Sequence, residues 1–307
     1  MKWGCCMEYL HKNRQAMADA VNLTSNQRKT SPSIVEKDYY VTMVLMELAK
    51  RTPFVVFKGG TSLSKCYQII RRFSEDIDIA VASKPTQGQM KRLKQAVCET
   101  AEVLGMTIPN LEATRSRRSY NRYILNYDSV VEETDPVLKT SVVLETSFAE
   151  VAFPTELLPV HSYLGEMIQG KAPDLCGKYG LEPFSMKVQR PERTLVDKVF
   201  AICDYYLEDK CTGHSRHIYD IYKLLQFVPM EEAFGCLVAE VRAERKKNQF
   251  CPAAQDSVDV SELLMQIIES SAYKRDYETV TVRLLEEEVP YETAIAALRQ
   301  ITAKELF

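Results

Sequence analysis

The most informative stretch of the chain is FVVFKGGTSLSKCYQIIRRFSEDIDIAVA, residues 54–82. It opens with the short apolar run FVVF, which predicts a buried strand. Two glycines and two hydroxyl residues at 59–62 then predict a turn, and the apolar spacing over 63–70 predicts a helix. The stretch ends in a second strand with two carboxylates two residues apart, Asp76 and Asp78. The predicted order is therefore strand, glycine turn, helix and acidic strand.

This order places anion-binding groups beside a pair of acids. A tight glycine turn that opens a helix exposes backbone N–H groups, and the helix dipole favours an anion there. Side chains alternate along a strand, so Asp76 and Asp78 share one face while Ile77 and Ile79 point into the core. Two carboxylates on one face repel each other unless a cation lies between them, and oxygen ligands suit Mg²⁺ or Mn²⁺. We therefore expect a metal-assisted site for a nucleoside triphosphate.

Three short segments carry a family resemblance. A glycine turn followed by an Asp-x-Asp strand resembles the nucleotidyltransferase superfamily. VEKDYYV (35–41), FKGGTSLSK (57–65) and RFSEDIDI (72–79) look most like the AbiEii/AbiGii abortive-infection and toxin–antitoxin nucleotidyltransferases. The alternative is a strand–turn–helix with a solvated acidic edge, which a lone Asp-x-Asp would favour. The glycine turn at the right distance upstream favours the resemblance.

Composition sets the outer limits of the prediction. A chain of 307 residues with 46% apolar residues predicts one large or two ordinary domains. The net charge of −3 gives no overall attraction to nucleic acid, so any RNA contact must come from a local patch. Nine cysteines without a C-x-x-C pair favour reduced thiols in a cytoplasmic protein. No apolar run is long enough for a membrane span, so no membrane partner is expected.

The pattern along the chain predicts an α/β (α+β) protein with a mixed sheet. Ser33 and Glu36 fit a capping box at the start of a helix over 34–50. Other helices are expected at 5–20, 86–104, from Pro191 to about 208, and at 214–227, 230–247, 258–272, 276–287 and 290–304. Strands are expected at 120–127, 139–148 and 185–188.

The predicted architecture is a nucleotidyltransferase-like mixed sheet with flanking helices, followed by a helical C-terminal half. We expect residues 1–160 to form the nucleotidyltransferase core with its N-terminal helices. We expect residues 161–307 to form a mostly helical domain that contributes to the active site.

A third acid, Glu145, lies in the strand VVLET (142–146) between apolar neighbours. An acid in a buried strand is costly unless it is paired or bound to metal. The resemblance implies a third catalytic carboxylate at this position, where it would ligate metal or help to deprotonate the acceptor hydroxyl. The alternative is a charge that protects an edge strand from aggregation.

Two residues of the helical half complete the predicted site. Lys198 lies in RTLVDKVFAICD with apolar and small neighbours, and the resemblance implies that it reaches the nucleotide phosphates; ordinary packing of its stem is the alternative. Asp220 matches the second acid of the family's R-D-x-x-D pattern, while His217 replaces the first. Asp220 could instead pair with Arg216 or Lys223 on a helix surface.

The resemblance also implies a set of residues that bind the nucleotide. They are Lys58, Gly59, Gly60, Thr61, Ser62, Lys65 and Ser74.

Two further clusters are less specific. Cys211, His214 and His217 have a spacing that could hold zinc, but no fourth ligand is apparent. Basic and aromatic residues interleave in a second cluster, which suits either RNA phosphates and stacking or a solvated strand. Its members are Arg115, Arg117, Arg118, Tyr120, Arg122 and Tyr123.

The expected activity is transfer of a nucleoside monophosphate from an NTP to an acceptor hydroxyl. The resemblance implies the toxin of a type IV toxin–antitoxin or phage-defence pair, a tRNA 3′ end as the acceptor, and a cognate antitoxin as regulator. A transferase that modifies a protein or a small molecule, and a non-catalytic NTP-binding protein, are the alternatives. Two aspartates and a third acid argue against a purely binding site.

Overall fold

The structure is a computed structural model that describes residues 8–131 and 138–307. Its residues group into two compact units by their contacts. Unit 1 holds residues up to Cys66, Glu75–Val151 and Thr155–Val188, and unit 2 holds Tyr67–Ser74, Ala152–Pro154 and Gln189–Phe307. The domain boundary expected at residue 160 stays a prediction, and each unit is described by itself below.

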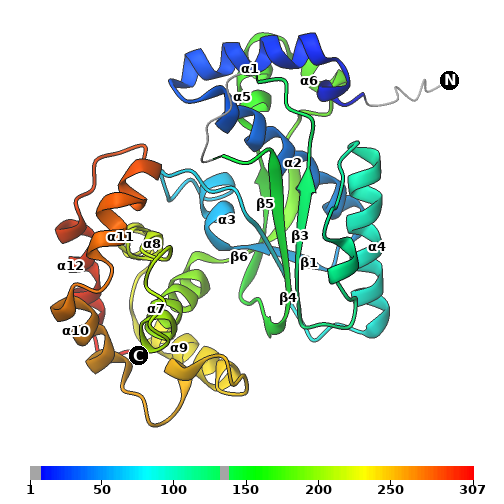
Figure 1. The fold of residues 1–307 in the computed structure, drawn as a ribbon. Coiled ribbons are helices and arrows are strands. Elements are labelled where there is room, and N and C mark those ends of the chain that lie inside the picture. The colour runs from blue at the N-terminus through cyan, green and yellow to red at the C-terminus, as the bar shows by residue number, and fades with distance from the viewer. Residues whose placement is uncertain (1–7, 132–137) are drawn as a thin grey trace. The chain divides into compact units, whose positions relative to one another are not determined.

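Unit 1 is built on one six-stranded mixed sheet (Figure 1). The order of its strands is β3-β4-β2-β1-β6-β5. The strands are β1 (Val55–Lys58), β2 (Ile77–Val81), β3 (Tyr120–Asn126), β4 (Ser141–Val151), β5 (Thr155–Val160) and β6 (Phe184–Gln189). Strand β2 pairs antiparallel with β1 and parallel with β4, while β3 closes the edge antiparallel to β4. The mixed sheet confirms the predicted fold class.

Helices of unit 1 pack on this sheet and on one another. They are α1 (Arg14–Arg28), α2 (Pro32–Arg51), α3 (Gly59–Lys65), α4 (Gln87–Val103), α5 (Tyr163–Lys171) and α6 (Pro173–Lys178), with short 3-10 turns at Leu10–Lys12 and Leu111–Ala113. Helix α2 is almost entirely buried and contacts α1, α4, α5 and β4. It is therefore the central helix of the unit 1 core.

The start of α2 differs from the predicted capping box. The helix begins at Pro32 after Ser31, and no side chain caps its first turn. Proline suits this position because its missing N–H would have no partner there. The Glu36 carboxylate instead accepts hydrogen bonds from the Ser129 hydroxyl at 2.5 Å and the Val130 N–H at 2.7 Å. A tertiary contact has replaced the local one.

Unit 2 is helical. Its helices are α7 (Pro191–Leu207), α8 (Arg216–Leu224), α9 (Glu232–Arg245), α10 (Val260–Ser270), α11 (Lys274–Thr279) and α12 (Tyr291–Thr302), with 3-10 turns at Pro252–Ala254 and Thr281–Leu284 (Figure 1). Helix α7 packs against α8, α9 and α10, and α12 packs against α8, α10 and α11. The predicted helices of the C-terminal half are present, with shifted ends; the region predicted as 276–287 begins as α11 and continues as a 3-10 turn.

Residues 67–74 belong to unit 2 although their neighbours in the chain belong to unit 1. The Phe73 N–H donates to the Leu284 carbonyl, the Glu286 N–H donates to the Arg71 carbonyl, and the Arg71 N–H donates to the Tyr219 hydroxyl. The helix expected over 63–70 is thus wrong beyond Lys65, where α3 ends. Gln68 has a φ of 56°, which interrupts a right-handed helix.

Two other predictions need correction. The helix expected at 5–20 begins at Arg14 and continues to Arg28, and residues 1–7 lie outside the described ranges. Strand β5 was not predicted, because TELLPV contains a proline and leaves Leu157 exposed at a sheet edge. Among the residues that the structure describes, no helix is long and apolar enough to span a membrane.

Candidate functional site

The acidic strand has the predicted alternation. Ile77 and Ile79 of β2 are buried, whereas Asp76, just before the strand, and Asp78, within it, are partly exposed. The two carboxylates therefore share one face of the sheet at the start of β2.

A row of four charged residues crosses this face. In the register of the sheet, Arg122 of β3 lies opposite Glu145 of β4, and Glu145 lies opposite Asp78 of β2. Asp78 in turn lies opposite Lys58 of β1. Residues at paired positions point to the same side of a sheet, and neighbouring strands lie about 4.8 Å apart. Two carboxylates thus occupy the middle of the row with one cation at each end. Arg122 Nε lies 3.4 Å from Glu145 Oε1, and both side chains are partly exposed.

An exposed tyrosine lies beside this row. Tyr120 shares its face of β3 with Arg122 and is about half exposed. Burial, then the charge of Glu145 and a hydrogen bond to it, raise the pKa of the Tyr120 hydroxyl above its ordinary value. The charge of Asp78 adds to this shift, so both acids are close enough to act on the phenol.

The glycine turn lies directly against the acids. Gly59 has a φ of 80°, which other residues rarely adopt, and a Cβ placed on it would overlap the Asp78 carboxylate. Thr61 Oγ1 donates to the Asp76 carbonyl at 2.5 Å, and Ser62 Oγ donates to the Gly59 carbonyl at 2.9 Å. Both hydroxyls are buried and hold the turn to the acidic strand. The phosphate-binding role predicted for this turn stays a prediction.

Lys65 was predicted to bind the nucleotide, but in the structure its partners are groups of the protein. Its ammonium group is buried and lies 2.5 Å from Asp38 Oδ1, 2.8 Å from Thr42 Oγ1 and 3.1 Å from the His161 carbonyl. An ammonium has three N–H donors, and these three acceptors account for all of them. The Tyr163 N–H donates to the other Asp38 oxygen at 2.7 Å. Lys65 therefore joins α2, α3 and α5 and has no donor left for a phosphate.

Lys198 and Asp220 meet inside unit 2. Lys198 Nζ lies 2.6 Å from Asp220 Oδ2, and Arg72 donates to both Asp220 oxygens at 2.7 Å. Burial alone would raise the pKa of Asp220, but the charges of Arg72 and Lys198 hold that pKa well below its usual value. Burial lowers the pKa of Lys198, which Asp220 opposes and Arg72 reinforces.

His217 borders this cluster on the side of Lys198. Its Nδ1 lies 3.3 Å from Lys198 Nζ. Burial, and then the charge of Lys198, lower the pKa of His217 well below its usual value, so the ring is neutral at pH 7. The histidine found where the family pattern has an acid thus adds no negative charge.

The surface ion pair considered for Asp220 is wrong. Asp220 is completely buried, and Lys223 pairs with Glu287 at 2.8 Å instead. Ser74, predicted to bind nucleotide, lies in the segment that belongs to unit 2 and is partly exposed. Its role stays a prediction.

The structure does not support a zinc site at the cysteine–histidine cluster, and it changes the picture of the basic–aromatic cluster only in part. No group of three or more His, Cys, Asp or Glu side chains in the described ranges is placed to hold a metal ion, which includes the cysteine–histidine cluster considered for zinc. The rings of His214 and Tyr205 stack 3.6 Å apart instead. In the basic cluster, Arg115, Arg117 and Arg118 are exposed, but Tyr123 is buried and cannot stack on a base.

Sequence reasoning missed two groups. The segment VEKDYYV places three successive charged residues, Glu36, Lys37 and Asp38, at buried positions of α2. Lys37 pairs with Glu75, next to the acidic strand, and donates to the Lys139 carbonyl at 3.0 Å. Arg72 was also missed. Three charges inside an otherwise apolar helix were the available signal for the first group; nothing near Arg72 in sequence indicated a partner 148 residues away.

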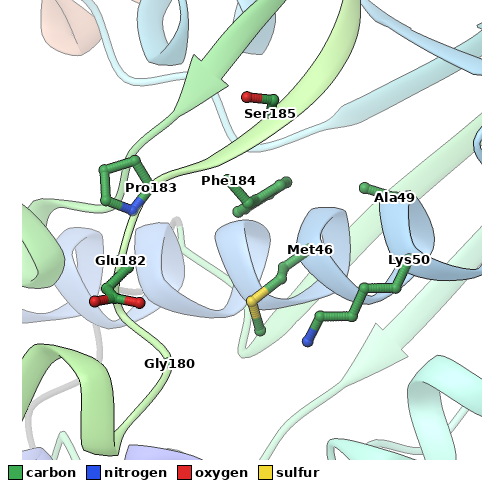
Figure 2. A pocket seen from close by; sticks show the side chains of 8 residues that line it. All are labelled: Met46, Ala49, Lys50, Gly180, Glu182, Pro183, Phe184 and Ser185. Atoms are coloured by element: carbon green, nitrogen blue, oxygen red, sulfur yellow. The ribbon is translucent and has the colours of Figure 1, made fainter.

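A pocket of about 340 Å³ lies elsewhere in unit 1, between α2 and the segment that leads into β6 (Figure 2). Met46, Ala49 and Phe184 form its apolar part, and Lys50 and Glu182 lie at its border. None of the predicted site residues lines it. We assign it no part in the candidate site.

Comparisons with known proteins identify the family and a similar fold. The family described as "Nucleotidyl transferase AbiEii toxin, Type IV TA system" matches residues 44–300. The fold is similar to MenT4, a nucleotidyltransferase toxin from Mycobacterium tuberculosis H37Rv, with a TM-score of 0.61 and 17% identity over 93% of this chain and 89% of that one. A search of the curated proteins gave no match. The family match covers most of the sequence, and the chain therefore belongs to the AbiEii family of nucleotidyltransferase toxins of type IV toxin–antitoxin systems.

Proposed function

We propose that this nucleotidyltransferase moves a nucleoside monophosphate from an NTP to the 3′ end of a tRNA in a Mg²⁺-dependent reaction. The observation that carries the proposal is the placement of Asp78 and Glu145 at paired positions of neighbouring strands, with the Gly59 turn against Asp78. The carboxylates and the backbone N–H groups that can bind phosphate then lie at the same end of neighbouring strands. This is the arrangement that a metal-bound triphosphate needs.

The residues present fit magnesium. Mg²⁺ is usually held by one or two carboxylates together with substrate phosphates and water, so a ready-made cage of protein ligands is not required. Asp76 and Asp78 supply carboxylate oxygens on one face. Glu145 does not form a preformed cluster of three acids with them, and we propose it as the third protein ligand of a metal that arrives with the triphosphate. Bound there, Mg²⁺ or Mn²⁺ would neutralise charge on the triphosphate and polarise the reacting phosphoryl group.

The chemistry assigns separate tasks to the protein groups. The acceptor hydroxyl oxygen forms a bond to the α-phosphorus, the bond from that phosphorus to the bridging oxygen breaks, and pyrophosphate leaves with the electron pair. Glu145 accepts the hydroxyl proton in this scheme. The backbone of Gly59 and Gly60 contacts the phosphates. Lys198, by the family resemblance, stabilises negative charge on the leaving pyrophosphate, and Asp220 holds Lys198.

An RNA acceptor is supported by the surface next to the acids. Tyr120 is exposed beside Glu145 and presents a ring on which a terminal base can stack. Arg115, Arg117 and Arg118 are exposed in the segment just before β3 and can contact phosphates. A cognate antitoxin is the expected regulator because the family consists of toxins of type IV toxin–antitoxin systems.

The direct test is incubation with each α-labelled NTP, Mg²⁺, total RNA and total protein, followed by gel separation. We expect the label to appear on tRNA, and its transfer to stop when Mg²⁺ is chelated. The double variant Asp76→Asn, Asp78→Asn should abolish transfer by the folded protein, because it removes the two carboxylates proposed to bind the metal. Asp128→Asn is the matched control, since that carboxylate is fully exposed.

The outcomes separate the parts of the proposal. Wild-type transfer by the double variant would refute the role of the acidic strand. A label found on protein or on a small molecule would refute the RNA acceptor and leave nucleotidyl transfer intact. NTP binding without release of pyrophosphate would refute the transfer reaction itself.

A salt titration tests the RNA surface. Replacing Arg115, Arg117 and Arg118 together by glutamine should weaken tRNA binding and reduce its salt dependence. Each lost phosphate contact lowers the slope of log K against log salt by about 0.9 for a duplex and about 0.7 for a single strand. NTP binding should not change, because the phosphates are assigned to the Gly59 turn. An unchanged slope would make these arginines ordinary solvated residues.

A further inference from the structure

The hydroxyl of Tyr120 lies beside the acids of the candidate site. Tyr120 shares its face of β3 with Arg122, and Arg122 lies opposite Glu145 in the register of β3 and β4. Tyr120 is therefore the diagonal neighbour of Glu145. Diagonal neighbours in a sheet are about 7–8 Å apart, which is within reach of an aromatic side chain. The Tyr120 hydroxyl donates a hydrogen bond to the Glu145 carboxylate.

Tyr120 is also open to solvent. It is 48% exposed, and it is the only exposed tyrosine in the described ranges, where the others are buried or partly buried. The charge of Asp78 acts on the phenol together with that of Glu145, so the hydroxyl is near both acids. A substrate held by these acids would therefore lie against the phenol oxygen.

Two other hydroxyls next to the acids differ from that of Tyr120. Thr61 Oγ1 donates to the Asp76 carbonyl, and Ser62 Oγ donates to the Gly59 carbonyl. Both are buried, and a reaction at either oxygen would break a contact that holds the glycine turn. The Tyr120 hydroxyl is exposed and donates to a carboxylate, which can take its proton.

We propose that Tyr120 is a self-acceptor: with NTP bound and no RNA in the site, the enzyme transfers a nucleoside monophosphate to its own Tyr120 hydroxyl. This modification site rests on the proposed function, because it uses the same transfer chemistry. The phenol oxygen forms a bond to the α-phosphorus, the bond from that phosphorus to the bridging oxygen breaks, and pyrophosphate leaves with the electron pair. Glu145 accepts the phenol proton, and the product is a tyrosyl phosphodiester.

The attachment of Tyr120 to the enzyme favours this reaction. A hydroxyl fixed on a strand reacts within one molecule, and well-oriented groups of this kind behave as if they were present at about 10⁵ M or more. Self-transfer is therefore expected to be faster than hydrolysis of the NTP by water. The neighbouring acids disfavour the phenolate, so the proton moves to Glu145 as the new phosphorus–oxygen bond forms.

The modified tyrosine would close the site to RNA. A nucleotide on Tyr120 would occupy the surface on which a terminal base of the acceptor is proposed to stack. Its phosphodiester would also bring a negative charge beside Glu145 and Asp78, which repels the RNA backbone. Self-transfer is therefore a form of autoinhibition that acts while no RNA covers Tyr120.

The test is incubation of the purified full chain with each NTP and Mg²⁺ in the absence of RNA, followed by intact-mass measurement and peptide mapping. We expect the mass to rise by one nucleoside monophosphate per chain, with the modification on Tyr120. The mass of the isolated protein is measured first, because modification during expression counts as the same result. Peptide mapping of wild type locates the modified residue, so the result does not depend on the folding of a variant. A chain that stays unmodified, or is modified at another residue, overturns the proposal.

Three variants identify the acceptor oxygen and the source of the activity. Tyr120→Phe should remove the modification, and Tyr163→Phe should be modified like wild type. Tyr163 is the matched control because it is a partly buried tyrosine of the same unit, on α5. The double variant Asp76→Asn, Asp78→Asn should stay unmodified, which excludes a contaminating transferase. Modification of Tyr120→Phe to the wild-type extent overturns the proposal.

The dependence on protein concentration tests transfer within one molecule. A tyrosine that reacts in its own site gives a first-order rate constant that is the same over a wide range of protein concentration. A rate constant that rises with protein concentration would mean that one molecule modifies another, and it overturns the placement of Tyr120 in its own site.

Parallel reactions with tRNA separate self-transfer from the proposed function, and the enzyme is identified by its own mass, so it is not confused with a protein acceptor. Label on tRNA with none on the enzyme contradicts self-transfer alone. Label on Tyr120 with none on tRNA contradicts the RNA acceptor alone, and label on neither contradicts both. Where both are labelled, prior incubation with NTP should reduce transfer to tRNA. Undiminished transfer by the fully modified enzyme would overturn its autoinhibition.

Discussion

Two buried lysine–aspartate pairs, one in each unit, have opposite hydrogen-bond balances. In unit 1, Lys65 donates to Asp38 and to two further oxygen atoms, so every ammonium donor has an acceptor. In unit 2, Asp220 is shared between Lys198 and Arg72, and the lysine keeps one donor without an acceptor in the described ranges. The first pair has an acceptor for every ammonium donor, whereas the second leaves one donor of Lys198 without an acceptor among the described residues.

The difference teaches how to separate structural from functional lysines in this fold. Burial and a carboxylate partner are common to both pairs, so neither property identifies a role. The number of acceptors around each ammonium differs, with three at Lys65 and two at Lys198. A lysine with all three donors satisfied stabilises the packing of helices, and a lysine with a donor left over can bind an anion.

The largest expected effect is on stability, in Lys65→Met. This variant leaves the Asp38 carboxylate buried with a backbone N–H in place of its cation. Removing one partner of a buried pair costs about 3–5 kcal/mol of unfolding free energy. Denaturant unfolding measures it, with Lys274→Met as an exposed control. The folded fraction should keep its specific activity; a loss of activity without loss of stability would end the distinction between the two pairs.

Lys198→Met should show the reverse pattern. We expect nucleotide transfer to fall about 100-fold, as when one donor to developing charge is removed. The unfolding free energy should fall less than in Lys65→Met, because Asp220 keeps both hydrogen bonds from Arg72. Steady-state kinetics and denaturant unfolding of the same preparation give both values. Equal stability losses in the two variants would contradict the asymmetry.

The acid side of the stability profile gives a smaller effect. The pKa of Asp220 is held well below its ordinary value, so its stabilisation is full above the unfolded pKa of about 4 and is lost as pH falls below it. The stability advantage of wild type over Asp220→Asn should therefore shrink below about pH 4, by at most about 1.4 kcal/mol per pH unit. Unfolding midpoints measured from pH 6 downward test this. Parallel profiles for the two proteins would mean that the pKa of Asp220 is the same in the folded and unfolded states.

The smallest effect is expected at an exposed pair. Arg122 is at one end of the charge row and Glu145 lies next to it, and their side chains are 51% and 32% exposed. Arg122→Gln should change the unfolding free energy by less than about 1 kcal/mol, because water screens such pairs. Unfolding at low and high salt measures the difference. A loss as large as that of Lys65→Met would show that exposure does not separate the pairs of this protein.

Local patterns were enough to predict much of the fold. The buried strand β1, the alternating strand β3 and the amphipathic helix α4 carry their signals within 4, 7 and 17 residues. Strand β5 has no such signal because it is an exposed edge. The end of α3 depends on residues 67–74, whose partners lie far along the chain.

The candidate site was likewise predictable where its residues are close in sequence and unpredictable where they are far apart. Asp76, Asp78 and Gly59 are close in sequence, so their spacing predicts their geometry. The roles of Lys65 and Lys198 could not be separated in this way, since both lie in helices with apolar neighbours. Their acceptors come from residues as far as 96 positions away, and the third member of the second cluster is 148 positions from its partner.

The assignment of residues 67–74 to unit 2 has a consequence for shortened forms of this toxin. A gene cut between residues 188 and 189 would encode one product with Arg72 and another with Asp220. Each product would carry a charge whose hydrogen-bonding counterpart lies on the other. If either product failed to fold, loss of the Arg72–Asp220 ion pair would explain the failure without any dependence of one domain on the other. A circularly permuted gene that keeps both residues in one polypeptide is therefore the sounder route to dissecting the protein.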